Sequence, residues 1–130
     1  IYSSSVAVYG EPKYLPVDEN HPLNPLSPYG LSKLASEWYI LLYNKLYGLD
    51  YTILRYSNVY GPRQRTEGDA GVIAIFTKKI LNGENPIIFG DGNQTRDFVF
   101  VKDVAKANLL SIKSKNGIYN IGSGKETRII

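Results

Sequence analysis

A tyrosine and a lysine stand four positions apart in the stretch SPYGLSKLASEWY, where a helix is predicted to begin. Tyr29 and Lys33 are at positions i and i+4, so their side chains share one face of that helix. A lysine ammonium near a phenol stabilises the phenolate and lowers the pKa of the phenol, and the helix dipole acts in the same direction. Such a phenol is suited to general-base catalysis. On its own, the pair is explained more simply as a tyrosine and a solvated lysine on an exposed helix face.

The helix that carries this pair has clear end signals. Ser27 is a suitable N-cap, and Pro28 stands at the first helical position, where its missing N–H is not needed. The helix is predicted to run to about Tyr47, with Gly48 at its end. Helical spacing of apolar residues predicts a buried stripe roughly opposite the tyrosine and the lysine. This stripe consists of Leu31, Leu34, Ala35, Trp38 and Leu42.

The rest of the chain alternates strands and helices. Polar, Gly/Pro-rich loops are predicted at 11–27 and 57–71, and a turn precedes the strand that ends near residue 101. The other predicted strands are 1–10, 51–56, 85–90 and 117–122, and the other predicted helices are 72–83 and 102–114. This order predicts an α/β architecture with parallel strands.

The composition excludes several classes of function. The 130 residues carry a net charge of +3, spread along the chain without a basic run, so neither nucleic acid nor a membrane surface is an expected partner. No apolar run approaches the roughly 20 residues of a membrane span. The chain has no cysteine for disulfide or thiolate chemistry, and its one histidine, His21, leaves no cluster for zinc. We expect a cytoplasmic protein without a metal site.

Several motifs occur in a fixed order along the chain. They are SSSVAVYG, PYGLSK, LRYSNVYGPRQ, IIFGDGNQTRDFVFVKDVAKA and YNIGSG. Together they resemble the extended short-chain dehydrogenase/reductase family, specifically its nucleotide-sugar epimerases and dehydratases, over essentially all 130 residues. The resemblance implies the later part of a Rossmann-type doubly wound parallel sheet, followed by the beginning of a small α/β substrate-binding domain.

The resemblance implies a Ser/Tyr/Lys catalytic set of Ser5, Tyr29 and Lys33. Tyr29 would take a proton from a sugar hydroxyl while hydride leaves the same carbon for a nicotinamide, and Ser5 would orient the oxygen. Lys33 would lower the tyrosine pKa and bind the nicotinamide ribose. Ser3, Tyr29 and Ser57 are also assigned to cofactor binding, although the favoured explanation of Ser3 is a strand end that satisfies its own backbone groups.

The residues after Ser5 narrow the implied reaction. Family dehydratases carry Asp-Glu there to expel water, whereas this chain has Val6 and Ala7, which neither donate nor accept a proton. Reversible oxidation remains, and the resemblance therefore implies NAD-dependent 4-epimerisation, interconverting UDP-glucose and UDP-galactose through a 4-keto intermediate. UDP-glucuronate 4-epimerisation, or another reductase or dehydratase activity of the family, stays open. A non-catalytic sugar-nucleotide-binding protein is the alternative from another class.

The resemblance also assigns a substrate site. Asn58 and Arg96 match positions that contact the substrate diphosphate, and an arginine fork suits phosphate oxygens. Phe89 matches an aromatic position beside the base, and Val72 is assigned to the substrate as well. Core packing is the alternative for Phe89. For Arg96, the alternative is an ion pair with Asp97 or Asp103.

Two positions depart from the family pattern. Ser57 stands where epimerases often have a bulkier residue, and Gly71 where some have an amide side chain. These departures leave the sugar preference open.

The glycine-rich motif that holds a dinucleotide is not found in these residues. The resemblance implies that G-x-x-G-x-x-G lies upstream of this excerpt, so the excerpt alone is expected to be inactive, and the choice between NAD and NADP rests on that motif. Residues 1–68 are expected to belong to the NAD-binding domain and 69–130 mainly to the substrate-binding region, with return strands to the Rossmann sheet. The full-length protein is expected to be a homodimer that uses the helix 28–47.

Two other motifs are rejected. IGSGKET lacks the Walker pattern, because Tyr119 stands at the required first glycine and Glu126 at the required Ser or Thr. GDGNQT fails similarly. His21 is interpreted as a solvated or loop-capping residue without chemistry, and Trp38 mainly as a core or interface residue.

Overall fold

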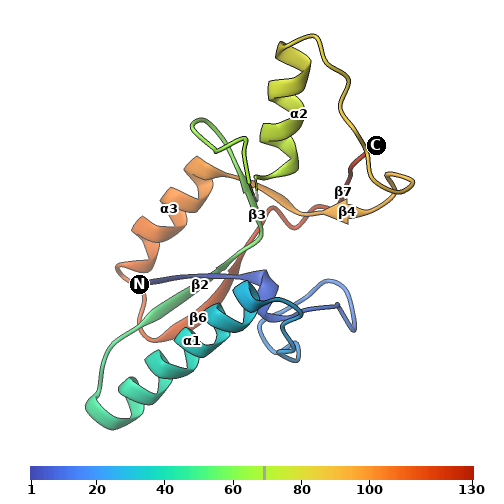
Figure 1. The fold of residues 1–130 in the computed structure, drawn as a ribbon. Helices are drawn as coiled ribbons and strands as arrows, with labels where there is room; N and C mark the ends of the chain where they lie inside the picture. The colour runs from blue at the N-terminus through green and yellow to red at the C-terminus, as the bar shows by residue number, and fades with distance from the viewer. Residues whose placement is uncertain (69) are drawn as a thin grey trace. The chain divides into compact units, whose positions relative to one another are not determined.

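The computed structural model describes residues 1–68 and 70–130, which form two compact units (Figure 1). Unit 1 consists of Ile1–Ser57 and Ala105–Ile121, and unit 2 consists of Asn58–Val104 and Gly122–Ile130. The chain therefore passes from one unit to the other after Ser57, Val104 and Ile121. Each unit is made of two separate stretches of sequence.

Unit 1 is built on a three-stranded parallel sheet. Its strands are β1 (Tyr2–Ser5), β2 (Thr52–Tyr56) and β6 (Gly117–Ile121), in the order β1-β2-β6. Thr52, Ile53, Leu54 and Arg55 of the central strand are all buried, as is usual when both faces of a parallel sheet are covered. The three strands lie within predicted ranges. The residues after β1 form a short 3₁₀ helix, η1 (Val6–Val8), so that predicted strand is shorter than expected.

The main helix of unit 1 is α1 (Pro28–Tyr47), and its predicted ends are confirmed. Ser27 Oγ accepts a hydrogen bond from the Gly30 amide at 3.0 Å. At the other end Gly48 has a left-handed backbone, with φ of 69°, and donates to Asn44 O at 2.8 Å. These local caps explain why the sequence was sufficient to place the helix.

The predicted buried stripe of α1 is mostly wrong. Leu34 is only 2% exposed, but Trp38 is 58% exposed, and Leu31 and Leu42 are exposed as well. The helix instead packs through a neighbouring face, because Gly30 brings it against η1. A Cβ added at Gly30 would lie 2.6 Å from Ala7 O. The small core of this region consists of Val8, Tyr9 and Leu34, with Val6, Val17 and Leu23 packed against it.

Unit 2 holds two pairs of short strands. β3 (Asn58–Tyr60) pairs in parallel with β5 (Phe98–Phe100), and β4 (Thr95–Arg96) pairs antiparallel with β7 (Thr127–Arg128). The unit also contains α2 (Val72–Leu81), which agrees with the predicted helix 72–83. The helix α3 (Val101–Ser111) begins in unit 2 and continues into unit 1.

The strand predicted at 85–90 is wrong, because this segment has no regular structure and its apolar side chains are largely exposed. Strand-forming residues need a neighbouring edge with which to pair, and the structure gives this segment none among the described residues. Conversely, β3 lies in a predicted loop, and β7 was not predicted. In the part of the chain that the structure describes, no helix is long and apolar enough to cross a membrane.

Candidate functional site

The predicted catalytic residues all lie in unit 1, at the carboxyl end of β1 and the start of α1. Ser5 is the last residue of β1, and its Oγ accepts a hydrogen bond from the Ala7 amide at 3.2 Å. Tyr29 is an exposed residue of the first turn of α1, and Lys33 follows one turn later. The carboxyl ends of parallel strands are where α/β folds form their sites.

Lys33 joins β1 to the beginning of α1. Its Nζ donates a hydrogen bond to Ser3 O at 2.9 Å. The same atom lies 5.7 Å from the ring centroid of Tyr29 and 5.3 Å from that of Tyr2, within the range of a cation–π contact. The ammonium therefore lies near the rings of both Tyr2 and Tyr29.

Ser5 and Tyr29 do not bond to each other directly. Among the described residues, the only hydrogen bond of Ser5 Oγ is the one to the Ala7 amide. Catalytic groups often meet only through the substrate atom that they share. The Ser5 hydroxyl therefore still has hydrogen-bonding capacity for a ligand.

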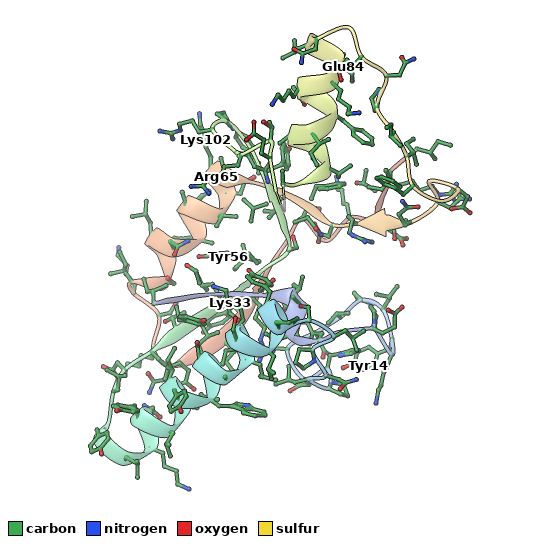
Figure 2. The ribbon with its side chains drawn as sticks, viewed as in Figure 1. Tyr14, Lys33, Tyr56, Arg65, Glu84 and Lys102 are labelled. Carbon is green, nitrogen blue, oxygen red and sulfur yellow. The ribbon has the colours of Figure 1, made fainter. Side chains whose placement is uncertain are left out.

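The two predicted cofactor serines have different surroundings. Ser3 Oγ lies 3.1 Å from Tyr56 Oη, and Ser3 O accepts from Lys33 Nζ. Lys33 and Tyr56 are labelled in Figure 2. Tyr56 Oη also accepts from the Asn108 amide at 2.8 Å. Ser57 lies one residue after β2, and its backbone N–H donates to Ile121 O at 2.9 Å. The Ser57 Oγ is buried and has no hydrogen-bond partner within the described chain.

A buried ion pair that was not predicted from the sequence joins α1 to β2, near the predicted catalytic residues. Arg55 and Glu37 are 2% and 1% exposed, and they form a bidentate pair: Nη2 to Oε2 at 2.6 Å and Nε to Oε1 at 3.0 Å. Ser4 Oγ donates to the same carboxylate. An arginine inside the apolar strand TILRY was the available signal, because a buried arginine needs a partner.

Tyr9 extends this ion pair to a hydrogen-bonded network. Arg55 Nη1 donates to Tyr9 Oη at 2.8 Å, and Tyr9 donates to Asn120 Oδ1 at 2.7 Å. Burial raises the pKa of the Tyr9 hydroxyl, and the nearby Arg55 only partly opposes this. Burial alone would lower the pKa of Arg55, but hydrogen bonds and charge interactions with Glu37 and Tyr9 raise it. Both groups therefore keep their protons at neutral pH.

The predicted diphosphate contacts lie in unit 2. Asn58 begins β3, and both its backbone N–H and its Nδ2 donate to Asp97 O, at 3.0 and 3.2 Å. Arg96 is exposed, and its Nη1 donates to Thr95 O at 2.7 Å. Within the described residues Arg96 forms no ion pair, so the alternative of a salt bridge with Asp97 or Asp103 is wrong.

The carboxylate of Asp97 is occupied by the glycine-containing loop that follows β6. It accepts from the backbone N–H and the Oγ of Ser123, at 2.8 and 2.7 Å, and from the Gly124 N–H at 2.9 Å. The amides that would hold phosphate in a phosphate loop thus bind an anion supplied by the chain itself. This agrees with the rejection of IGSGKET as a phosphate loop.

Phe89 and Val72 complete the predicted substrate residues. Phe89 is 82% exposed, so the alternative of core packing is wrong. Val72 is the first residue of α2, preceded by Gly71 at the N-cap. A Cβ at Gly71 would lie 2.7 Å from the side-chain amide of Gln64, which donates to Val59 O at 3.1 Å. This amide explains why glycine suits position 71.

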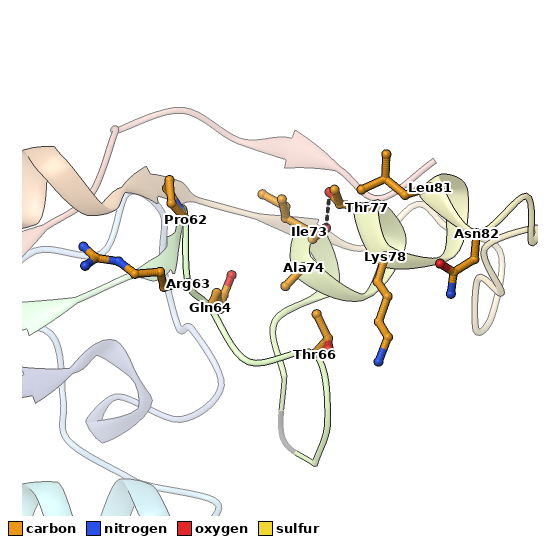
Figure 3. Close-up of a pocket in the computed structure, with 11 residues that line it drawn as sticks. Pro62, Arg63, Gln64, Thr66, Ile73, Ala74, Thr77, Lys78, Leu81 and Asn82 are labelled. Atoms are coloured by element: carbon orange, nitrogen blue, oxygen red, sulfur yellow. Dashed lines mark hydrogen bonds between the residues drawn. The ribbon is translucent and has the colours of Figure 1, made fainter.

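An open pocket of about 420 Å³ lies between the loop after β3 and α2 (Figure 3). Its lining includes Arg63, Gln64, Thr66, Thr77 and Lys78, and none of the predicted substrate residues. The Gln64 Oε1 is buried and has no partner in the described part of the chain. This pocket was not predicted from the sequence.

His21 is buried rather than solvated, and it fixes its own loop. Its Nε2 accepts from the Lys13 N–H at 2.9 Å, so Nδ1 carries the proton and donates to Pro22 O at 2.9 Å. The loop-capping interpretation is therefore the better one. No group of metal-ligating side chains occurs among residues 1–68 and 70–130.

Comparison with known proteins supplies the family. The model of the NAD dependent epimerase/dehydratase family matches residues 1–122. The chain belongs to this family. A putative UDP-glucose 4-epimerase of Methanocaldococcus jannaschii is 70% identical over 98% of this chain and 42% of its own length. The predicted resemblance to the extended short-chain dehydrogenase/reductase family is thereby confirmed.

Solved structures of the family confirm the α/β fold with a parallel sheet. A UDP-N-acetylglucosamine 4-epimerase from Methanobrevibacter ruminantium, in complex with UDP-N-acetylmuramic acid, has a TM-score of 0.96 and 49% identity, covering 98% of this chain and 42% of that one. A Thermus thermophilus UDP-glucose 4-epimerase in complex with NAD has a TM-score of 0.89 and 43% identity, covering 98% and 43%. The chain thus spans less than half the length of these family members.

The residues of unit 1 fit the cofactor of the epimerase/dehydratase family. The Ser57 Oγ is a buried hydroxyl that still needs a partner, which a bound molecule could supply. Lys33 presents an ammonium beside the Tyr29 ring at the sheet's carboxyl end. A polar ligand with hydroxyl groups, such as the nicotinamide ribose of NAD, suits this set of donors.

Proposed function

We propose that the intact protein carrying this chain is an NAD-dependent 4-epimerase of a nucleotide sugar, which interconverts UDP-glucose and UDP-galactose through a transient 4-keto intermediate. The observation that carries the proposal is the position of Lys33. Its Nζ is tied to Ser3 O on β1 and lies beside the Tyr29 ring. A protein that only binds sugar nucleotides has no need of a lysine held beside this tyrosine ring.

Three side chains would perform the proton chemistry. Tyr29 takes the proton from the C4 hydroxyl of the sugar, and Ser5 donates a hydrogen bond that orients the same oxygen. Lys33 stabilises the negative charge on the phenol and holds the ribose of the cofactor. The chemistry that bound NAD would supply is the removal and return of hydride at C4, and Tyr29 would return the proton to the sugar oxygen as hydride is restored on the opposite face. Ser3 and Ser57 contribute to the cofactor site.

The residues after Ser5 favour epimerisation over elimination. Val6 and Ala7 begin η1, immediately after the proposed catalytic serine. Neither side chain has an acidic or basic group, so nothing at these positions can protonate a leaving hydroxyl. The dehydratase alternative is disfavoured for this reason.

The proposal also assigns the residues that bind the nucleotide part of the substrate. Asn58 and Arg96 would bind the diphosphate, Phe89 would lie against the base, and Val72 would complete the contact. The exposed Phe89 ring and the absence of an ion pair for Arg96 among the described residues support these roles, since both groups remain accessible to a ligand. Residues 1–68 would serve mainly the cofactor and 69–130 mainly the substrate.

The experiment supplies the intact protein with UDP-galactose and NAD, and follows UDP-glucose by chromatography. We expect conversion in the wild type and a loss of about a hundredfold or more in Tyr29→Phe, because general acid–base catalysis contributes this much. Tyr47→Phe is the matched control, since Tyr47 is an exposed tyrosine at the other end of the same helix. Its activity should be unchanged.

Two outcomes would contradict the proposal. Conversion of UDP-glucuronate or of UDP-N-acetylglucosamine, but not of UDP-galactose, would move the assignment to another sugar and leave the mechanism intact. Binding of UDP-sugars without conversion, and without transient reduction of NAD, would support the non-catalytic alternative.

The assembly and location are also part of the proposal. Trp38, Tyr39 and Leu42 are exposed on α1, which supports a homodimer formed through this helix. A cytoplasmic location is tested by cell fractionation, where recovery in the membrane or secreted fraction would contradict it.

A further inference from the structure

A row of polar side chains crosses the three-stranded sheet of unit 1 on one face. Ser4 of β1 is the register partner of Arg55 on β2, and Arg55 is the register partner of Asn120 on β6. Neighbouring partners in a sheet project their side chains to the same face. Tyr9 Oη bridges Arg55 and Asn120, so the row is continuous across all three strands.

Glu37 connects this row to α1. Its carboxylate accepts two hydrogen bonds from Arg55, and a third from Ser4. Glu37 lies four residues after Lys33, so the two side chains leave the helix on one face, one turn apart. Lys33 binds Ser3 O on the same strand. Two successive residues of β1 are therefore each bound by one turn of α1.

We propose that Glu37 and Arg55 are positioning residues, which fix α1 at one register along β1 and so set where Tyr29 and Lys33 lie relative to Ser5. This inference rests on the proposed function and deepens it. Neither Glu37 nor Arg55 touches the reacting atoms, because both are buried between α1 and the sheet.

The chemistry of the pair favours positioning over simple stabilisation. A buried ion pair can often be replaced by apolar residues of similar size without loss of stability. Apolar side chains, however, tolerate sliding and rotation of a helix. A bidentate arginine–carboxylate contact holds only one geometry. A displacement of α1 would move Tyr29 and Lys33 relative to β1, on which Ser5 lies.

The test compares the intact wild type with the triple variant Ser4→Ala/Glu37→Leu/Arg55→Met. The three substitutions remove the whole polar contact together, so no charge is left buried. Tyr9 keeps its hydrogen bond to Asn120. We expect a folded protein whose kcat falls by between about ten- and a hundredfold, as misplacement of catalytic groups predicts, and whose KM stays within about twofold because the interactions with substrate are unchanged. An unchanged kcat overturns the proposal.

Hydrogen exchange gives a readout that does not depend on activity. Amides in the first turns of α1, residues 28–36, should exchange faster in the triple variant, while those of β2 should stay protected. Equal exchange in both proteins would overturn the proposal even if the wild type proved to have no epimerase activity. An inactive wild type with faster exchange in the variant would contradict only the proposed function.

If the triple variant does not fold, Ser4→Ala tests the positioning role instead. It removes one hydroxyl and leaves the ion pair in place, so folding should be kept. We expect kcat to fall by about threefold or more, in line with the loss of one hydrogen bond, and an unchanged kcat overturns the proposal. Glu67→Gln is the matched control, because it breaks the exposed pair with Lys78 in unit 2 and should not alter kcat.

Discussion

The buried Arg55 depends on Glu37 for its counter-charge. Replacing Glu37 with Gln leaves the buried Arg55 without a counter-charge, and breaking such a pair from one side typically costs about 3–5 kcal/mol. We expect a loss of stability of this size in denaturant unfolding of the intact protein. An exposed pair contributes little, so Glu67→Gln should leave the midpoint unchanged. A small effect of Glu37→Gln would mean that water reaches Arg55.

Tyr9 predicts a change of stability with pH. Its pKa is raised in the folded protein above the ordinary value of 10.0, chiefly by burial. The folded state therefore holds this proton more tightly than the unfolded state, and the stabilisation is complete below pH 10.0 and is lost as the pH rises through the folded pKa. Unfolding measured across alkaline pH should show a steeper decline in the wild type than in Tyr9→Phe. Parallel curves would contradict this assignment.

At the scale of the element, Asp97 connects three segments of unit 2. Its backbone carbonyl binds Asn58 at the start of β3, and its carboxylate binds the loop at 123–124. Asp97→Ala should therefore loosen the surroundings of Asn58 and Arg96. We expect weaker binding of UDP, by about tenfold as for the loss of hydrogen bonds to a charged group, measured by titration calorimetry.

Asp103→Ala is the control for Asp97→Ala, since Asp103 lies in the first turn of α3, outside this set of bonds. Equal UDP affinity in Asp97→Ala and the wild type would show that the loop does not support the diphosphate site.

The elements that the sequence predicted best are those with local signals. Ser27, Pro28 and Gly48 act within one or two turns, so the limits of α1 could be read without knowing its neighbours. The segment 85–90 has strand-forming residues but no partner edge, and β3 and β7 form because a partner is present. Pairing between distant segments is not encoded in the composition of either one.

In the candidate site, too, features set by nearby residues were predicted, and features set by packing between distant segments were not. The Tyr29–Lys33 pair was predictable because it depends on helical spacing alone. The contact of Lys33 with Ser3 O and the link between Glu37 and Arg55 depend on how α1 lies on the sheet. The apolar stripe of α1 was predicted wrongly for the same reason, because apolar residues alone do not show which face Gly30 turns toward η1.

At the scale of the whole molecule, the exposed apolar face of α1 predicts the oligomeric state. Trp38→Glu/Leu42→Glu places two charges on this face, and we expect the proposed dimer to dissociate, because burying unpaired charges is costly. Sedimentation velocity of the intact protein measures the change. Leu109→Glu is a control at an exposed leucine of α3, and dimers that persist in the α1 variant would contradict the assignment.

The order in which unit 1 is assembled has a consequence for protein synthesis. β1, α1 and β2 leave the ribosome before β6, which pairs with the central strand and follows only after residues 58–116 have been made. One edge of β2 therefore stays unpaired while most of unit 2 is translated. Unpaired edges of this kind invite aggregation. A nascent chain arrested before Gly117 should therefore depend on chaperones more than one arrested after Ile121.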